Sequence, residues 1–408
     1  MKYFKNTELA KLYNVSEKTV RNWVQAAAEG KLDLRLHTEN DKQYVANLSH
    51  NTSLIEELAK KGKKYKNSRG FKTIKPTAEF YKLYDPKQIM DIIANLDIYK
   101  EIPLQYSYFN SGAKRWDAYT QNLAKQDTPN SLRNTKELLD LNLKYLDSLI
   151  DQYTSINIID VGVGNALPIR DVLDHFHKTG KLKRYIALDI SKEMVDIARK
   201  NIDEWFDNKI PFEGYIKDIN YDRFNDLLFP ESFGPNAESS VNLVFFLGGT
   251  LSNLREPGHA LATIHDSMGK RDILIFSKKL DTEKSRRYFE MTVSGNQEVN
   301  LVLKLLNIDE SLYTLEQFFD ERKMARQLQA RLNVAIAIKL ELFGKERVIE
   351  LNKGDGILLW RARHQNTLNT LDQFDESKFD LVQSSLSHDQ EYLLTMSRIK
   401  INPKEGSI

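Results

Sequence analysis

The chain has 408 residues, with 59 Lys and Arg against 57 Asp and Glu, and hydrophobic residues make up 41% of it. The length predicts two domains, and the composition is typical of a chain with a packed core. Cysteine is absent, which excludes disulfides, thiolate metal sites and reactions that need a cysteine nucleophile, such as methylation of cytosine at C5.

The N-terminus shows no export or membrane signal. Residues 1–5 lead into a polar helical pattern rather than an apolar signal core. No apolar run reaches the roughly 18 residues that a membrane-spanning helix needs. We therefore expect a cytoplasmic protein with no membrane partner and no metal.

Positive charge is concentrated at the N-terminus. Residues 1–75 hold 16 Lys and Arg against 8 Asp and Glu, whereas residues 76–408 hold 43 against 49. A small basic module on a mildly acidic body predicts one part that binds a polyanion and one part with another task. A basic surface without a partner is the alternative.

Residues 1–60 are expected to form a small helix-turn-helix domain with a hairpin. Leu9, Ala10, Val15, Val20 and Trp23 would form its core, and Ser16 would cap the second helix. The side chains facing outward from that helix suit phosphates and base edges; they are Lys18, Thr19, Arg21, Asn22 and Gln25. With a wing hairpin at residues 32–45, this stretch resembles MerR-like and excisionase-like domains. The resemblance implies binding of double-stranded DNA and formation of a homodimer, while the alternative is a docking module.

Residues 61–78 are basic and contain Gly62, Gly70 and Pro76, so we interpret them as a linker. Residues 79–150 have apolar residues at helical spacing. The linker would thus separate the helix-turn-helix domain from a second domain covering residues 79–408.

A buried strand and a glycine turn follow at residues 156–165. Gly162 and Gly164 in the segment Asp160–Asn165 allow the backbone to turn tightly and to approach a ligand. The next helix would direct its N–H groups at that ligand. A dinucleotide site would have a third glycine at position 167, where this chain has leucine, so the turn favours S-adenosylmethionine (SAM) over NAD.

Acidic residues end the next two strands. Asp189 ends the strand at residues 185–190 and could accept both ribose hydroxyls, and Ser191 after it would cap a helix at residues 192–206. Asp218 follows the third strand, where it could bond the adenine amino group. Each acid alone could be a cap or a surface charge, but three acids at successive strand ends, with Asp160 as the first, predict a SAM site.

Further strands are expected at residues 241–249 and 272–280, alternating with helices, which indicates a parallel α/β sheet. Residues 285–330 have a helical pattern. Later strand-like runs at residues 334–343, 346–360 and 391–400 fit an antiparallel closing edge. The predicted fold is α/β: a Rossmann-type class I methyltransferase sheet, with a core at about residues 155–285 and accessory regions at about 79–150 and 285–400.

Four segments carry a family resemblance: residues 106–113, 246–253 (Phe-Leu-Gly-Gly-Thr-Leu-Ser-Asn), 279–290 and 354–356. Across about residues 100–400 the chain resembles the histidine-specific SAM-dependent methyltransferases of ergothioneine biosynthesis. The resemblance implies that Asn253 holds the amino or carboxylate group of an amino-acid acceptor, and that Tyr108 and Tyr288 line the same pocket. The alternatives are a helix N-cap for Asn253 and ordinary packing for the tyrosines.

The chain departs from that family in two places. Residues 127–130 differ from its tyrosine-containing segment, and residues 360–365 (Trp-Arg-Ala-Arg-His-Gln) lack the glutamate and serine that read an imidazole. Arginines there would suit a different, acidic acceptor.

Three functions follow from these patterns. The first is N-methylation of an amino acid, a related small molecule or a protein amine by a SAM-dependent methyltransferase fused to a DNA-binding domain. The second is a transcriptional regulator that senses SAM or another ligand without turnover. The third, nucleic-acid modification, is the weakest, because the usual amino-methylation motif is replaced by Phe245–Gly248.

Overall fold

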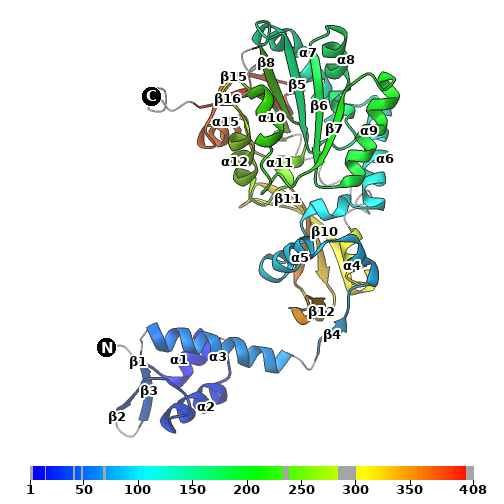
Figure 1. Cartoon of the computed structure of the whole chain (residues 1–408). Helices are drawn as coiled ribbons and strands as arrows, with labels where there is room; N and C mark the ends of the chain where they lie inside the picture. Colours follow the sequence, from blue (N-terminus) through cyan, green and yellow to red (C-terminus); the bar gives the residue numbers. More distant parts are fainter. Residues whose placement is uncertain are drawn as a thin grey trace. The chain divides into compact units, whose positions relative to one another are not determined.

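The computed structural model describes residues 3–13, 15–39, 42–46, 49–67, 70–232, 239–283 and 300–400. The chain divides into two compact units (Figure 1). Residues 1–73 with 335–337 form the first, and residues 74–334 with 338–408 form the second.

The N-terminal unit contains two short helices, α1 (Asn6–Leu12) and α2 (Glu17–Ala28), and a sheet with strand order β1-β3-β2. Its strands are β1 (Tyr3–Phe4), β2 (Leu36–Glu39) and β3 (Lys42–Ala46). Leu9, Val20 and Val24 are buried together with residues of the hairpin, and the Ser16 side chain accepts a hydrogen bond from the Thr19 N–H. The cap explains why α2 begins at residue 17.

The basic segment expected as a linker at residues 61–78 is largely structured. Helix α3 spans Ser49–Asn67, strand β4 spans Lys72–Ile74, and α4 begins at Ala78. Ile55 and Ala59, four residues apart, are buried on one face of α3. This apolar spacing holds the helix, so that the single Gly62 in its interior, which costs about 1 kcal/mol, does not end it.

The second unit is built on a seven-stranded sheet with the order β15-β16-β9-β8-β5-β6-β7. Its strands are β5 (Ser155–Val161), β6 (Leu182–Asp189), β7 (Phe212–Ile216), β8 (Ser240–Phe246), β9 (Ile273–Lys279), β15 (Phe379–Leu386) and β16 (Tyr392–Ile399). The first five are parallel, and β16 runs antiparallel to both β9 and β15. The chain returns from β7 to β8 on the other side of β5, so the strand order reverses at β5.

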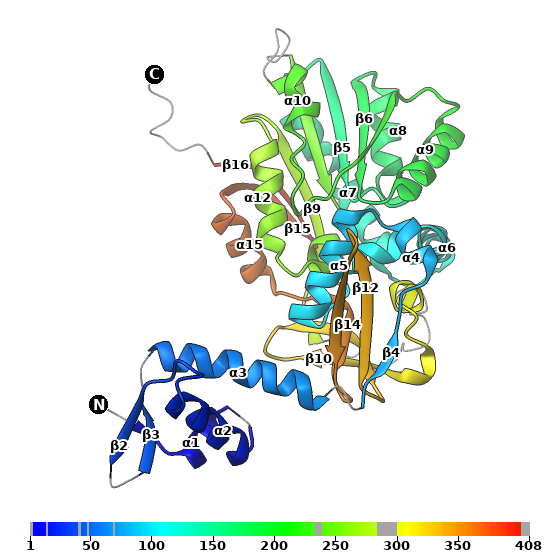
Figure 2. The same ribbon diagram turned by 60° about the horizontal axis from the view of Figure 1, so that its bottom comes forward.

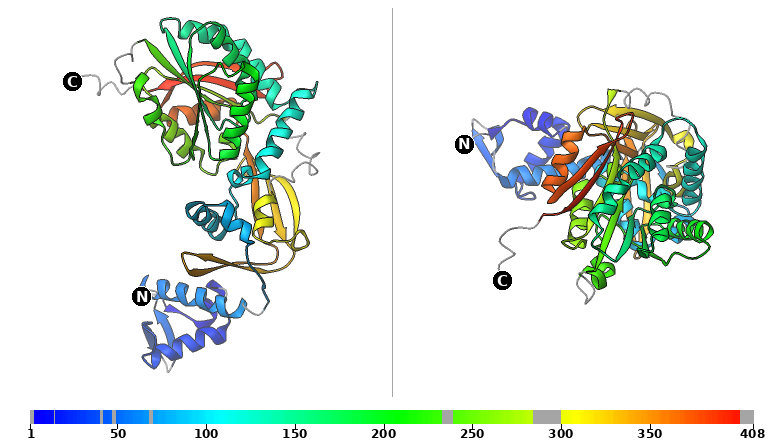
Figure 3. Two further views of the ribbon diagram at one scale, coloured as in Figure 1. Left: turned by 45° about the vertical axis from the view of Figure 1, so that its right-hand side comes forward. Right: turned by 90° about the horizontal axis from the view of Figure 1, so that it is seen from above.

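Helices cover both faces of this sheet (Figures 2 and 3). One apolar core contains residues of α7 (Ser131–Leu149), α8 (Arg170–Lys178) and α9 (Lys192–Phe206). The other contains residues of α10 (Asn225–Ser232), α11 (Thr250–Asn253), α12 (Pro257–Ser267) and α15 (Thr367–Glu376). Alternate residues of the strands enter the two cores, as expected of strands buried on both faces.

The expectation of helices throughout residues 285–330 is wrong where the structure describes them. Only α14 (Leu301–Leu305) and a 3-10 turn (Glu310–Leu312) are helical, and β10 (Tyr313–Asp320) and β11 (Ala325–Leu332) follow. The two strands pair in antiparallel fashion without a bulge, and the other edge of β11 pairs with β14 (Gly356–Arg363). Long-range pairing thus overrides the local helical pattern.

The expected closing edge is also corrected. Strands β12 (Ile336–Leu342) and β13 (Lys345–Leu351) form a separate sheet of order β13-β12-β4, and β14 pairs with β11. The antiparallel edge of the seven-stranded sheet is made by β15 and β16, so the Rossmann core extends beyond residue 285 to residues 379–399.

In the second unit, α4 (Ala78–Leu83), α5 (Pro86–Tyr99), a 3-10 turn (Leu104–Tyr108) and α6 (Ser111–Lys125) precede α7 and the sheet. Among the described residues, no helix is long and apolar enough to cross a membrane.

Candidate functional site

The glycine turn lies directly after β5. Gly162 and Gly164 have φ of 71° and 54°, and the Gly162 N–H donates to the Leu188 carbonyl at 2.8 Å. A Cβ on Gly162 would lie 3.1 Å from the Thr250 Oγ1, which follows β8. The turn therefore needs glycine at position 162 for its backbone angle and for its close approach to Thr250, the first residue of α11 (Thr250–Asn253).

Asp189 is buried at the end of β6, beside this turn. Its carboxylate accepts hydrogen bonds from the backbone N–H groups of Gly164, at 3.3 Å, and Ser191, at 3.1 Å. Burial raises the pKa of Asp189 to about 6, although these hydrogen bonds oppose the change. The residue is thus held in place by the turn while lining the cavity described below.

Asp218 follows β7 and lines the same cavity. Its Oδ1 accepts hydrogen bonds from the backbone N–H of Asn220, at 3.0 Å, and from the Asn220 side chain, at 2.8 Å. Burial raises the pKa of this carboxyl group as well.

Asp160 does not line the cavity. It is 4% exposed, and its Oδ2 accepts a hydrogen bond from the Tyr185 hydroxyl at 3.0 Å. Burial raises its pKa to about 7, and the Asp189 charge adds to the increase. The structure thus separates Asp160, beneath the turn, from the residues that line the cavity.

Tyr108 and Asn253 meet in the cavity from distant parts of the chain. Asn253 is the last residue of α11, and its side-chain amide lies close enough to the Tyr108 hydroxyl to lower the pKa of that group, whereas Gly249, not Asn253, is the N-cap of the helix. Burial raises the pKa of Tyr108 above its usual range, so the hydroxyl stays protonated. Tyr288 lies outside the described residues.

The glycine turn, Asp189, Asp218, Tyr108 and Asn253 line one cavity of about 790 Å³ at the carboxyl ends of the parallel strands. At β5, β6 and β7 its lining includes Gly162, Gly164, Asp189 and Asp218, and further along the sheet it includes Asn253, after β8, and Lys279, the last residue of β9. The volume falls within the range of about 300–1,000 Å³ that small-molecule sites occupy. Because the strand order reverses at β5, this is where an open α/β sheet binds its ligands.

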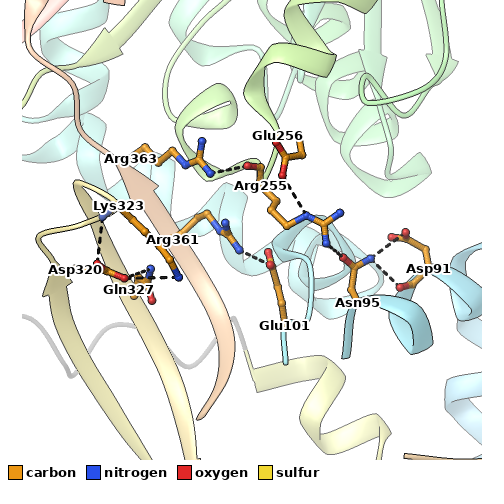
Figure 4. A network of polar contacts seen from close by, with 10 residues as sticks. All are labelled: Asp91, Asn95, Glu101, Arg255, Glu256, Asp320, Lys323, Gln327, Arg361 and Arg363. Atoms are coloured by element: carbon orange, nitrogen blue, oxygen red, sulfur yellow. Dashed lines mark hydrogen bonds and ion pairs between the residues drawn. The ribbon is translucent and has the colours of Figure 1, made fainter. Parts of the chain in front are cut away.

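Strand β14 forms one wall of the cavity. The alternation of its side chains corrects the expectation that the arginines of residues 360–365 bind an acidic acceptor. Trp360, Ala362 and His364 line the cavity, but Arg361 and Arg363 do not. Arg361 forms an ion pair with Glu101, and Arg363 donates to the Arg255 carbonyl at 2.6 Å (Figure 4). Successive side chains of a strand point to opposite faces, so these arginines are not available to read an acceptor.

The arginines belong to a buried polar network beside the cavity. Arg255 donates to the Asn95 Oδ1 at 2.6 Å and stacks on the Tyr99 ring, 3.8 Å from its centre. The side chains of Arg361 and Glu101 are 8% and 9% exposed. The network joins α5, the loop after Asn253 and β14, and so holds two walls of the cavity together (Figure 4).

Several lining residues were not predicted from the sequence: Trp116, Asp117, Lys279, Arg326, His364, Asp389 and Glu391. Trp116 and Asp117 lie on α6, and the other residues lie on or beside strands that are far apart in the sequence, so no spacing pattern joins them. His364 is the exception. It is four residues after Trp360, so the two-residue period of a strand would have placed both side chains on one face once residues 356–363 were recognised as a strand.

In the N-terminal unit, Lys18, Arg21, Asn22 and Gln25 are exposed on α2. Thr19 is half-buried, and its hydroxyl hydrogen-bonds the Ser16 hydroxyl at 2.8 Å, so it serves the helix cap.

Among the described residues, no group of three or more His, Asp or Glu could hold a metal ion.

A family model described as histidine-specific, SAM-dependent methyltransferase matches residues 88–399. No curated protein matches the chain in a sequence comparison. Similar solved structures include an S-adenosylmethionine-dependent methyltransferase from Clostridium acetobutylicum, at 8% identity and a TM-score of 0.36, covering 71% of this chain and 99% of that one. Human N-acetylserotonin methyltransferase in complex with SAM has 11% identity and a TM-score of 0.37, with 98% and 88% covered. Magnesium protoporphyrin IX methyltransferase from Synechocystis has 8% identity and a TM-score of 0.36, with 78% and 100% covered.

Proposed function

Because the chain belongs to the family of histidine-specific, SAM-dependent methyltransferases, we propose that this SAM-dependent enzyme methylates the nitrogen of an amino acid or a related amine. The observation that carries the proposal is the single cavity that runs from the glycine turn and Asp189 to Asn253 and Tyr108. Cofactor and acceptor would share it.

The residues at the glycine turn fit SAM. No side chain stands at Gly162 and Gly164, which would let the backbone approach the cofactor closely. The Asp189 carboxylate would accept hydrogen bonds from the ribose hydroxyls, and Asp218 would accept one from the adenine amino group. Asp160 would act from below, by holding the turn through Tyr185 rather than by contact with the cofactor.

Asn253 and Tyr108 would bind the amino acid end of the acceptor. A zwitterion needs neutral donors and acceptors in a closed site, and an amide beside a protonated hydroxyl supplies both. Tyr288, from the family resemblance, would line the same pocket.

SAM, when bound, supplies a methyl group on a positively charged sulfur and leaves as S-adenosylhomocysteine. The chain's task is then to hold a neutral acceptor nitrogen in line with that methyl group, because positioning is the main contribution to such a displacement. The acceptor nitrogen would take the methyl group as the sulfur releases it, and the methylated nitrogen would then lose a proton to water.

Methyl transfer tests the proposal directly. With radiolabelled SAM and a panel of amino acids and amines, we expect label in at least one acceptor. Asn253→Ala should raise the KM for that acceptor by about 10- to 100-fold, because a hydrogen bond to a charged group contributes roughly 1.5–3 kcal/mol. Asn369→Ala, an exposed asparagine on α15, is the matched control and should change nothing. Transfer to no member of the panel, or an unchanged KM in Asn253→Ala, contradicts the proposal.

The affinity for SAM should depend on pH through Asp189. Its pKa of about 6 means that the free protein protonates this carboxyl group as the pH falls below 6. The protonated form is the weaker acceptor for two hydroxyls, so the affinity should fall by up to about tenfold per pH unit below 6. Calorimetric titration at pH 5, 6, 7 and 8 measures this. An affinity that is constant down to pH 5 would show that Asp189 does not titrate in the site.

We also propose that the N-terminal unit is a helix-turn-helix domain that binds double-stranded DNA and supports a homodimer. The support is the exposed polar set on α2 together with the excess of positive charge in residues 1–75. Of the five residues expected to contact DNA, Lys18, Arg21, Asn22 and Gln25 carry this proposal most directly, because the Thr19 hydroxyl is engaged with Ser16.

Fluorescence anisotropy with a pool of labelled duplexes tests DNA binding. The triple variant Lys18→Ala, Arg21→Ala and Asn22→Ala should bind about 10- to 100-fold more weakly and show a shallower salt dependence. Lys200→Ala with Lys209→Ala removes the same positive charge from exposed positions of the second unit and serves as the control. Equal losses in both variants would indicate a non-specific charge effect instead.

A further inference from the structure

The part of the cavity beyond Asn253 has a distinct character. It is formed at the ends of β9, β11, β14 and β16, away from the glycine turn. Its lining residues, here called the distal subsite, are Lys279, Arg326, Trp360, His364, Glu391 and Tyr392. In an open α/β sheet with the cofactor over β5 and β6, these residues lie on the acceptor's side.

His364 is the central feature of the distal subsite. His364 is 5% exposed; the Leu280 backbone is a weak hydrogen-bonding neighbour that raises its pKa slightly, and neither ring nitrogen has a partner at full hydrogen-bond geometry among the described residues. Buried polar groups are almost always hydrogen-bonded, and leaving both nitrogens of a buried imidazole unsatisfied costs stability. An unsatisfied imidazole that lines a binding cavity therefore points to a ligand group that completes its hydrogen bonds.

The charges around His364 indicate which kind of ligand group would bind there. Burial, together with the positive charges of Arg326, Lys279 and Lys278, lowers the pKa of His364 to about 3. The imidazole is thus neutral, and the neighbouring cations favour an anionic group beside it, while Glu391 and Asp389, which line the same cavity, offset part of their charge.

Other charged groups also face this region. Arg363 lies close to Lys278, whose ammonium donates to the Gln365 side chain at 2.7 Å. Glu391 lies 3.6 Å from the Lys279 ammonium, and Asp389 accepts hydrogen bonds from Asn134 and Ser387. The two acids are engaged with neighbouring groups, and neither counts among the causes that shift His364.

We propose that the distal subsite binds a carboxylate of the methyl acceptor, with His364 and Lys279 as its donors, so that the acceptor is an acidic amino acid or a similar anionic amine. The inference rests on the proposed function and names its substrate class. A neutral imidazole can donate one hydrogen bond to a carboxylate oxygen, and Lys279 adds a charged donor on the same side. Trp360 supplies an apolar wall in this subsite.

Calorimetric titration of the full chain loaded with S-adenosylhomocysteine tests the inference. The probes are L-glutamate and L-aspartate, each compared with its neutral amide, L-glutamine or L-asparagine, and L-histidine. We expect at least one acid to bind tenfold or more tighter than its amide and than L-histidine. An amide or L-histidine that binds as tightly as the acids, or no binding of either acid, overturns the inference.

Variants identify the residues responsible. His364→Phe and Lys279→Gln should each reduce the acid-to-amide affinity ratio severalfold or more, whereas His364→Gln, which keeps a donor, should retain part of it. Lys200→Gln, exposed on α9, should leave the ratio unchanged. Thermal denaturation checks that each variant is folded, and Lys279→Gln gives an independent test if His364→Phe does not fold. A ratio that is unchanged in both variants overturns the assignment.

The same titrations separate the two proposals. Binding of S-adenosylhomocysteine to the wild-type chain tests the cofactor site alone. If it binds and the acids are not preferred, only the distal subsite is wrong; if it does not bind, the proposed function fails and this inference fails with it.

Discussion

Asp189→Ala is expected to lower the affinity for SAM by about 100-fold or more. A carboxylate that accepts two hydroxyl groups loses two charge-assisted hydrogen bonds when it is removed, each contributing roughly 1.5–3 kcal/mol, and 1.4 kcal/mol corresponds to a factor of ten. The variant also removes the carboxylate that accepts hydrogen bonds from the Gly164 and Ser191 N–H groups, which loosens the turn. Isothermal titration calorimetry with SAM measures the change.

Two further variants make the result specific. Asp196→Ala removes an exposed carboxylate from α9, and its affinity for SAM should equal that of the wild type. Asp189→Asn keeps the size of the side chain and should lose less than Asp189→Ala. If SAM binds Asp189→Ala as tightly as it binds the wild type, Asp189 does not contact the cofactor.

Arg361→Met is expected to lower the free energy of unfolding by about 3–5 kcal/mol. The Arg361–Glu101 ion pair is buried, and removal of one partner leaves an uncompensated charge away from water. Burial lowers the pKa of Arg361, while Glu101 opposes this by stabilising the charged guanidinium. Urea-induced unfolding followed by circular dichroism measures the loss.

A surface ion pair provides the comparison. Arg347 on β13 and Asp97 on α5 are 2.8 Å apart, and their side chains are 55% and 39% exposed. Arg347→Met should cost less than about 1 kcal/mol. The double variant Glu101→Gln with Arg361→Met should cost less than the sum of the single variants, because it leaves no isolated charge. A cost in Arg361→Met no greater than that in Arg347→Met contradicts the expectation.

The network in Figure 4 also links stability to the site. Arg255 lies two residues after Asn253, and Arg363 on β14 binds its carbonyl. Arg361→Met should therefore disturb the acceptor end of the cavity more than the glycine turn.

Local chemistry determined what could be predicted from the sequence. The turn at Gly162 and Gly164 depends on backbone angles that glycine adopts readily, and the cap at Ser16 needs only its own helix. Buried parallel strands such as β5 and β8 are continuous apolar runs that can be identified without knowing their neighbours. The SAM-dependent family and the α/β sheet follow from these features.

Tertiary pairing decided the rest. Strands β10 and β11 have polar residues on much of their length and were interpreted as helical, since only their partners distinguish the two states. The edge formed by β15 and β16 depends on contact with β9, more than a hundred residues earlier. Arg361 and His364 lie three residues apart, yet the pleat directs one into a buried ion pair and the other into the cavity. The sequence by itself determined where the glycine turn is, because that turn is local; only the tertiary structure decided which side chains line the cavity, because strand pairing sets those faces.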